Sequence, residues 1–246
     1  MIKTDSLIIG SGEVGSAIYK VLEENGKNVA MYDIKDPDFE SEINNCETKT
    51  LHITYPYSDK FFHTTYFYIE KTKPELVIIH STVPVGTTKE LIGRNCFSSV
   101  IYFVHSPVRG QHPNLYESLK TFVKYIGTDS DIAFEMTKKE LKGMPVRRMK
   151  STETSELAKL LCTSYYGIMI AWHREMKDMC DYFNVDFYEA VTDLNRTYNE
   201  GYCKFRPNVV RPILDPPSGK IGGHCVVENS ILLGKQYKSN FLDLIK

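Results

Sequence analysis

The sequence lacks several features that would place it in a specialised class. Its 30 Lys and Arg residues nearly cancel its 31 Asp and Glu residues, and no run of like charge stands out. A nucleic-acid-binding protein normally carries a basic patch, so this balance argues against such a partner. No apolar stretch is long enough to span a membrane, and the polar residues 1–5 do not resemble a signal peptide. We therefore expect a cytoplasmic protein that binds neither nucleic acid nor membrane.

Cysteine is scarce, and the six cysteines are scattered. They form no Cys-x-x-Cys pair and have no His-rich companion, which argues against a disulfide framework and against a zinc site. We expect reduced thiols and no bound metal. Internal repeats and low-complexity segments are also absent from the 246 residues, a length that suffices for one large domain or two modest ones.

The most informative pattern that is present is a glycine-rich turn between an apolar run and a helical stretch. The turn consists of Gly10, Ser11, Gly12, Glu13, Val14 and Gly15. A GxGxxG motif in this strand–turn–helix context is typical of dinucleotide binding. Gly10 would allow the tight turn, Gly12 would let the backbone approach a pyrophosphate, and Gly15 would let the helix pack close to the sheet.

An acidic residue at the end of the next apolar run completes this pattern. Asp33, eighteen residues beyond Gly15, would accept hydrogen bonds from a ribose 2′-hydroxyl, which favours NAD over NADP. The pyrophosphate would sit on the unpaired N–H groups at the start of the helix. Lys35 leaves some tolerance for NADP. We expect NAD as the cofactor, and a glycine-rich turn without a ligand is the alternative.

Apolar strand-like runs alternate with helical stretches through the first half of the chain. The expected strands are residues 6–9, 28–32, 50–54, 76–80, 99–103 and 124–127, and the expected helices are 14–25, 60–73, 88–92 and 132–141. Such alternation predicts βαβ units around a parallel sheet that is covered on both faces. The predicted fold is α/β, with a Rossmann-type, doubly wound, mainly parallel sheet and a ligand crevice at the carboxyl ends of its strands.

The pattern becomes purely helical after Arg147. Apolar residues recur with a helical period from Ser151 to about Phe183, which predicts one long central helix packed on several sides. Glu153 and Glu156 would favour the positive end of its dipole. A helix at about 187–195, a loop over 201–223 and a last helix from about 227 follow. We expect a dinucleotide-binding domain over 1–148 and a smaller all-helical domain over 149–246.

A second candidate site lies in the loop before the last helix, where Cys225 follows two glycines and a histidine. A thiol near a helix N-terminus can act as a nucleophile, because the helix dipole favours the thiolate. A small buried hydrophobic residue at a helix start is the other interpretation. Residue types alone leave both open.

Five segments occur here in the order found in one enzyme family. They are Gly10–Gly15, Tyr55-Pro56, the STVPVGT string from Ser81 to Thr87, Ser155–Leu160, and Gly222-Gly223-His224-Cys225. The chain thus resembles the UDP-glucose/GDP-mannose dehydrogenases of the 6-phosphogluconate dehydrogenase-like superfamily. Its GGHC loop looks most like that of the UDP-N-acetylhexosamine dehydrogenase branch.

The resemblance implies an NAD-dependent oxidoreductase that oxidises the primary alcohol of a small-molecule substrate, a nucleotide sugar. It implies that Cys225 attacks an aldehyde intermediate and that Lys159 stabilises the substrate oxygen. Ser81 and Thr82 would line the nicotinamide side of the cofactor site. Further implied contacts are Tyr55 and Pro56 with the cofactor, and Thr163, Gly222, Gly223 and His224 with the substrate. A homodimer formed through the helical domain is also implied, although the chain's own last helices could cover the same apolar residues.

Some positions depart from the family pattern. Thr163 stands where the family has asparagine, and Asn229, an amide that cannot act as a base, stands where it has aspartate. Residues 106–111 lack the family's two glutamates, and no counterpart of its C-terminal UDP-binding domain follows Cys225. Two other functions therefore remain open: a catalytically reduced NAD-binding module or subunit, and a two-electron hydroxyacid or imine dehydrogenase of the same superfamily.

Overall fold

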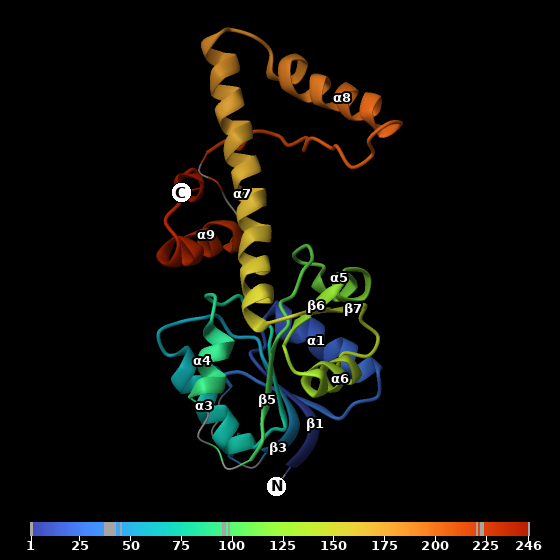
Figure 1. Cartoon of the computed structure of the whole chain (residues 1–246), viewed down its shortest axis with the longest axis vertical. Helices are drawn as coiled ribbons and strands as arrows, with labels where there is room; N and C mark the ends of the chain where they lie inside the picture. Colours follow the sequence, from blue (N-terminus) through green and yellow to red (C-terminus); the bar gives the residue numbers. More distant parts are fainter. Residues whose placement is uncertain are drawn as a thin grey trace. The chain divides into compact units, whose positions relative to one another are not determined.

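The computed structural model describes residues 2–36, 43–44, 46–94, 97, 99–219, 221 and 224–245. The chain divides into two compact units, Met1–Lys159 and Leu160–Lys246. One helix, α7 (Thr152–Tyr182), passes without interruption from the first unit into the second (Figure 1).

The first unit is built on a seven-stranded sheet. Its strands are β1 (Ile2–Ile9), β2 (Val29–Tyr32), β3 (Cys46–Ile53), β4 (Leu76–Ile79), β5 (Tyr102–His105), β6 (Lys124–Gly127) and β7 (Val146–Met149). Their order is β2-β1-β3-β4-β5-β6-β7, and only the β5–β6 pair is antiparallel. The predicted α/β fold with a mainly parallel sheet is confirmed.

Helices cover both faces of this sheet, as the apolar character of its strands requires. The helices are α1 (Glu13–Glu24), α3 (Phe61–Thr72), α4 (Thr87–Gly93), α5 (Leu115–Thr121) and α6 (Asp131–Glu140). Successive strand residues point to opposite faces, so Leu7 packs in one buried cluster with α3 and α4, while Ile8 packs in another with α1, α5 and α6. Figure 1 shows α3 and α4 on one side of the strands and α1 and α6 on the other.

The register of the parallel strands aligns the segments that follow them. Ile9 lies opposite Tyr32 and Ile53, Ile53 opposite Ile79, and Ile79 opposite His105. The turns after β1, β2, β3, β4 and β5 therefore begin at one edge of the sheet. This edge is where an open α/β sheet binds its ligands.

Three expectations for the first unit need correction. Helix α5 and strand β7 were not predicted, and the strand expected at 99–103 is displaced to Tyr102–His105. Strand β7 carries Arg147 and Arg148 at its centre. It lies at the end of the sheet and pairs only with β6, so its sequence lacks the continuous apolar run of a central strand.

The second unit is helical. It contains α7 from Leu160 onward, a π-helix η1 (Tyr188–Asp193), α8 (Leu194–Cys203), α9 (His224–Gln236) and α10 (Asn240–Asp243). The long helix is confirmed, but the expectation that it is covered on several sides is wrong for the chain alone, because Tyr165, Tyr166 and Trp172 are about half exposed or more. The helix expected at about 187–195 continues to Cys203, and the last long helix starts at His224 rather than at about 227. In the described part of the chain, no helix combines the length and the apolar character needed to cross a membrane.

Candidate functional site

The glycine-rich turn has the geometry that its motif predicts. Gly10 adopts a φ of +111°, and a Cβ on Gly15 would lie 1.9 Å from the Gly10 carbonyl oxygen, so neither position accommodates a side chain without strain. A Cβ on Gly12 would meet nothing within 4 Å. Gly12 is the N-cap of α1, and no side chain caps this helix start. Open space next to uncapped N–H groups suits an incoming phosphate.

Asp33 lies beside this turn, as the sequence predicts. Its Oδ2 accepts hydrogen bonds from the Ser11 backbone N–H at 2.8 Å and from the Ser11 hydroxyl at 3.1 Å, and its Oδ1 accepts one from the Lys35 N–H at 3.1 Å. The bond from the Ser11 N–H contributes most to lowering the pKa of Asp33 below its ordinary value. The carboxylate is therefore ionised at neutral pH and partly exposed at the tip of β2.

Hydrogen bonds connect the turns that follow neighbouring strands. The Thr54 hydroxyl donates to the Gly10 carbonyl at 2.9 Å, and the Ser81 hydroxyl donates to the Tyr55 carbonyl at 2.5 Å. The His105 Nε2 lies 3.2 Å from the Ser81 carbonyl oxygen. Burial lowers the pKa of His105 to about 3, so the ring is neutral and its Nε2–H donates to Ser81. The predicted cofactor segments after β1, β3 and β4 thus form one connected edge.

The half-buried ring of Tyr55 packs against the core below this edge. It lies against Phe61 and Tyr68, with centroid distances of 5.4 and 5.9 Å, and its hydroxyl lies 2.7 Å from the Thr65 hydroxyl. Burial raises its pKa. The Tyr55 carbonyl, which accepts from Ser81, belongs to the edge. Pro56 is exposed, Thr82 is half-buried and Ser81 is buried.

A buried carboxylate holds the segment after β4. Glu156 on α7 is fully buried, and it accepts hydrogen bonds from the backbone N–H of Gly86 at 2.6 Å and of Thr88 at 2.9 Å, and from the Thr88 hydroxyl at 2.7 Å. Burial raises its pKa, and these bonds oppose the rise. The expectation that Glu156 serves the start of its own helix is wrong, because its carboxylate caps α4 instead. The SELAKL motif contains this residue, but only the structure shows its partners.

Lys159 lies one turn further along α7 and is half-buried. Its Nζ donates to the Val108 carbonyl at 2.9 Å, in the segment that follows β5. The first turns of α7 therefore contact the loops after both β4 and β5. An ammonium group held in this position can stabilise negative charge that develops on a nearby oxygen.

Cys225 lies in the first turn of α9 and is half-buried. One turn further along, the Asn229 amide donates to the Thr163 hydroxyl on α7 at 3.2 Å. The two positions that depart from the family pattern are therefore hydrogen-bonded to each other. The helices approach closely here, since a Cβ on Gly167 would lie 2.6 Å from the Val226 Cγ1.

Two of the predicted substrate-contact residues, Gly222 and Gly223, lie outside the described residues. The side chain of a third, His224, lies outside them as well. Among the residues that are described, no group of three His, Cys, Asp or Glu side chains could hold a metal ion.

Curated proteins with similar sequences share one name. UDP-N-acetyl-D-mannosamine dehydrogenase from Methanococcus maripaludis is 29% identical over 153 residues, which cover 61% of this chain and 33% of the relative. The enzyme of the same name from Pyrococcus horikoshii is 27% identical over 174 residues, or 68% of this chain and 39% of the relative. The chain resembles nucleotide-sugar dehydrogenases. The match spans about a third of the length of these relatives, and no protein-family profile matches the chain.

Solved structures with the same fold include nucleotide-sugar dehydrogenases and a smaller enzyme. The UDP-D-ManNAc dehydrogenase of Pyrococcus horikoshii has a TM-score of 0.78 at 21% identity and covers 100% of this chain and 66% of its own. The UDP-glucose dehydrogenase of Pyrobaculum islandicum has a TM-score of 0.76 at 15% identity, and the match covers 99% of this chain and 67% of the other. The 3-hydroxyisobutyrate dehydrogenase of Mycobacterium tuberculosis has a TM-score of 0.72 at 12% identity, and the match covers 99% of this chain and 92% of the other. These likenesses establish the fold alone.

Proposed function

We propose that this chain is an NAD-dependent oxidoreductase of the nucleotide-sugar dehydrogenase type, which oxidises an alcohol. The observation that carries the proposal is the pairing of the glycine-rich turn with Asp33 at the carboxyl edge of the sheet. The similarity to named dehydrogenases supports the reaction class. In this proposal, residues 1–148 bind the cofactor, and residues 149–246 serve the substrate and dimerisation.

The residues of the turn fit a dinucleotide. The open side of Gly12 and the uncapped N–H groups of α1 would hold its pyrophosphate, and Asp33 would accept hydrogen bonds from a ribose in place of those from Ser11. An ionised Asp33 would repel a 2′-phosphate, which favours NAD over NADP. When bound, NAD takes up the hydride that leaves the substrate carbon.

Lys159 and Cys225 have separate roles in the proposed chemistry. The Lys159 ammonium stabilises the alkoxide that forms as the alcohol loses its proton. After the first oxidation, the Cys225 thiolate adds to the aldehyde carbon and forms a thiohemiacetal. Transfer of a second hydride, to a second NAD, would leave a thioester, which water would cleave to an acid and the free thiol.

One observation favours a shorter reaction as the second candidate. The hydrogen bond between Asn229 and Thr163 joins two neutral side chains, and neither can act as the base that activates water. The chain also covers nearly the full length of a hydroxyacid dehydrogenase structure. A two-electron dehydrogenase that needs Lys159 and not Cys225 is therefore the alternative enzyme, and an NAD-binding module without turnover is the alternative outside catalysis.

The apolar face of α7 supports a homodimer through the helical unit. Tyr165, Tyr166 and Trp172 are 61%, 51% and 48% exposed in the single chain. Aromatic side chains gathered on one helix typically mark an interaction surface. Light scattering coupled to size exclusion tests this part of the proposal, and a monomer would contradict it.

Thermal melting with cofactors and substrates tests the function. A ligand that binds only the folded chain raises the melting temperature by mass action. We expect NAD or NADH to raise it more than NADP or NADPH, and a UDP-sugar to raise it further in the presence of NADH. A cofactor shift without a sugar effect would favour the alternatives. No shift with any dinucleotide would refute the proposal.

A further inference from the structure

Three side chains near the start of α7 bind the loops at the carboxyl edge of the sheet. The Ser155 hydroxyl lies 2.8 Å from the His105 Nδ1, Lys159 donates to Val108, and Glu156 binds Gly86 and Thr88. Glu156 differs from the other two because it carries a buried charge whose three hydrogen bonds all go to one short segment.

The geometry of this segment makes Glu156 its capping group. Helix α4 begins at Thr87, and its N-cap, Gly86, has no side chain with which to cap the helix. The Glu156 Oε2 accepts from the Gly86 N–H, and its Oε1 accepts from both the N–H and the hydroxyl of Thr88. A remote carboxylate thus replaces the local Ser, Thr or Asp that normally caps a helix.

Both ends of the stretch between β4 and α4 are anchored. At its first end the Ser81 hydroxyl donates to the Tyr55 carbonyl and the Ser81 carbonyl accepts from His105, and at its last end Glu156 binds Gly86 and Thr88. Between these ends the side chain of Val83 is buried in the core. The residues between these anchors include Thr82, which the family resemblance places beside the nicotinamide. Release of either anchor would let this stretch adopt other conformations, so that cofactor binding would have to restore one of them.

We propose that Glu156 is a positioning residue for the cofactor: by capping α4 from α7 it holds residues 82–85 in the conformation that binds NAD. This inference rests on the proposed function, because it assumes that the segment borders the nicotinamide. It assigns to Glu156 an effect on cofactor affinity without any contact with the cofactor.

The test compares Glu156→Gln with a matched control on the same two helices. The glutamine has the same shape, and its oxygen can still accept from Thr88, but its NH2 group would face the Gly86 N–H, donor against donor. Glu153→Gln is the control, because Glu153 also joins α7 to α4 through an ion pair with Lys89 at 3.1 Å, on the surface. Isothermal titration gives the Kd for NAD, and thermal melting reports on folding.

We expect Glu156→Gln to raise the Kd for NAD about tenfold, the loss of one charge-assisted hydrogen bond, while Glu153→Gln leaves it unchanged. In a turnover assay the KM for NAD would rise by a similar factor and kcat at saturating NAD would change little. Thr88→Val removes only the hydroxyl donor and would give a smaller rise in the same direction. This variant also tests the inference if Glu156→Gln does not fold.

The outcomes separate the inference from the function on which it rests. A wild-type chain that binds no dinucleotide refutes the proposed function. A wild type that binds NAD, with Glu156→Gln and Thr88→Val lowering the melting temperature at an unchanged Kd, leaves the function standing and overturns the positioning role. Equal losses of affinity in Glu156→Gln and Glu153→Gln would also overturn it.

Discussion

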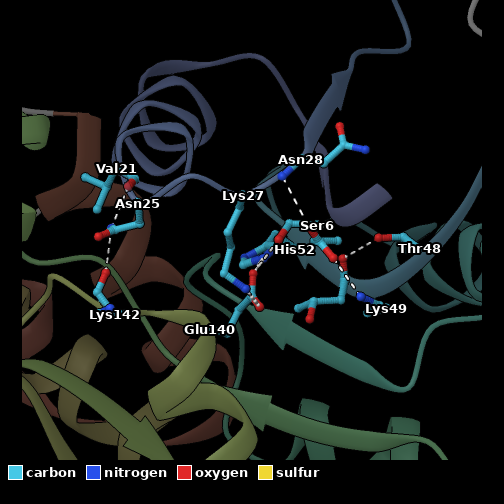
Figure 2. Close-up of polar contacts among 12 residues, drawn as sticks. Ser6, Val21, Asn25, Lys27, Asn28, Thr48, Lys49, His52, Glu140 and Lys142 are labelled. Carbon is cyan, nitrogen blue, oxygen red and sulfur yellow. Dashed lines mark hydrogen bonds and ion pairs between the residues drawn. The ribbon is translucent and has the colours of Figure 1, made fainter. Parts of the chain in front are cut away.

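A buried charge cluster within the first unit allows a quantitative prediction about stability. Glu140, the last residue of α6, is 5% exposed. It accepts hydrogen bonds from the Ser6 hydroxyl and the Lys27 ammonium, both at 2.5 Å, and its Oε1 lies 3.2 Å from the His52 Nε2 (Figure 2). The cluster joins α6 to β1, to the segment before β2, and to β3, so its charges stabilise long-range contacts.

Two stacked histidine rings extend this cluster into the sheet. His52 Nδ1 lies 3.0 Å from His80 Nε2, and His80 Nδ1 lies 2.8 Å from the Ser106 carbonyl oxygen. Burial holds the pKa of His80 well below its ordinary value, so the His80 ring is neutral. Through these contacts Glu140 on α6 is linked to β3, to the end of β4 and to the segment after β5.

The pKa of Glu140 gives the magnitude. Burial alone raises it, but the hydrogen bond and charge of His52, with the bonds from Lys27 and Ser6, outweigh burial and lower the pKa to about 2. Relative to the ordinary value of 4.5, this corresponds to about 3 kcal/mol of folding stability. Because the folded-state pKa is depressed, the contribution is complete above pH 4.5 and is lost as the pH falls toward 2.

The perturbation is Glu140→Gln, which removes the charge and keeps the shape. We expect a decrease in the free energy of unfolding of about 3 kcal/mol at pH 7, shrinking to about 1.4 kcal/mol at pH 3. Hydrogen exchange of the β3 and β4 amides in urea is the assay, since the single tryptophan lies in the second unit and does not report on this sheet. Glu135→Gln is the matched control, an exposed member of the same helix in a loose 3.9 Å pair with Lys138.

Two results would refute this reasoning. If the loss at pH 3 equals the loss at pH 7, the glutamine acts through packing and not through charge. If Glu140→Gln is as stable as Glu135→Gln at pH 7, the cluster contributes nothing beyond the cost of burying its charges, an outcome known for some buried ion pairs.

Three further predictions concern the candidate site. Gly12→Ala should keep the wild-type melting temperature and weaken NAD binding about tenfold or more, because its Cβ would occupy the space that the pyrophosphate needs. Gly15→Ala should also lower the melting temperature, because its Cβ has no space in the folded chain. Melting curves with and without NAD distinguish the two variants. Asp33→Ala should reduce the preference for NAD over NADP, measured as the ratio of Kd values. Asn229→Asp should raise the steady-state rate of NADH formation, measured by absorbance under multiple turnover, because hydrolysis of the thioester follows both hydride transfers and the new carboxylate can serve as its base.

The sheet could be predicted because its information is local in the sequence. The central strands β1, β4 and β5 each contain a run of apolar residues, and the glycine-rich turn with Asp33 lies within one βαβ unit. Strand β7 could not be found in this way, because an edge strand with two central arginines has no apolar run. Helix α5 has seven residues, too few to establish a helical period.

Much of the candidate site could not be predicted, because its contacts join residues far apart in the chain. The motif that contains Glu156 was visible, but its partners, Gly86 and Thr88, lie 70 and 68 residues away. His105 likewise lies just beyond the strand expected at 99–103, and only its 3.2 Å contact shows that it holds the Ser81 carbonyl. A polar residue in a sequence does not indicate which donor or acceptor it meets.

The start of α7 nevertheless shows an unusual pattern, in which polar side chains are buried and apolar ones are exposed. Ser155 and Glu156 are 1% and 0% exposed, whereas Leu157 and Leu161 are 37% and 50% exposed, the reverse of an ordinary amphipathic helix. Burial of a serine and a glutamate is favourable only where they find hydrogen-bond partners, and here these are backbone groups of the segment after β4 and of His105 at the end of β5. The hydrophobic period correctly located the helix, but it did not show that polar side chains of its first turns are buried. A long helix whose apolar residues are exposed while its polar residues are buried is therefore a reason to look for a loop that the polar face holds.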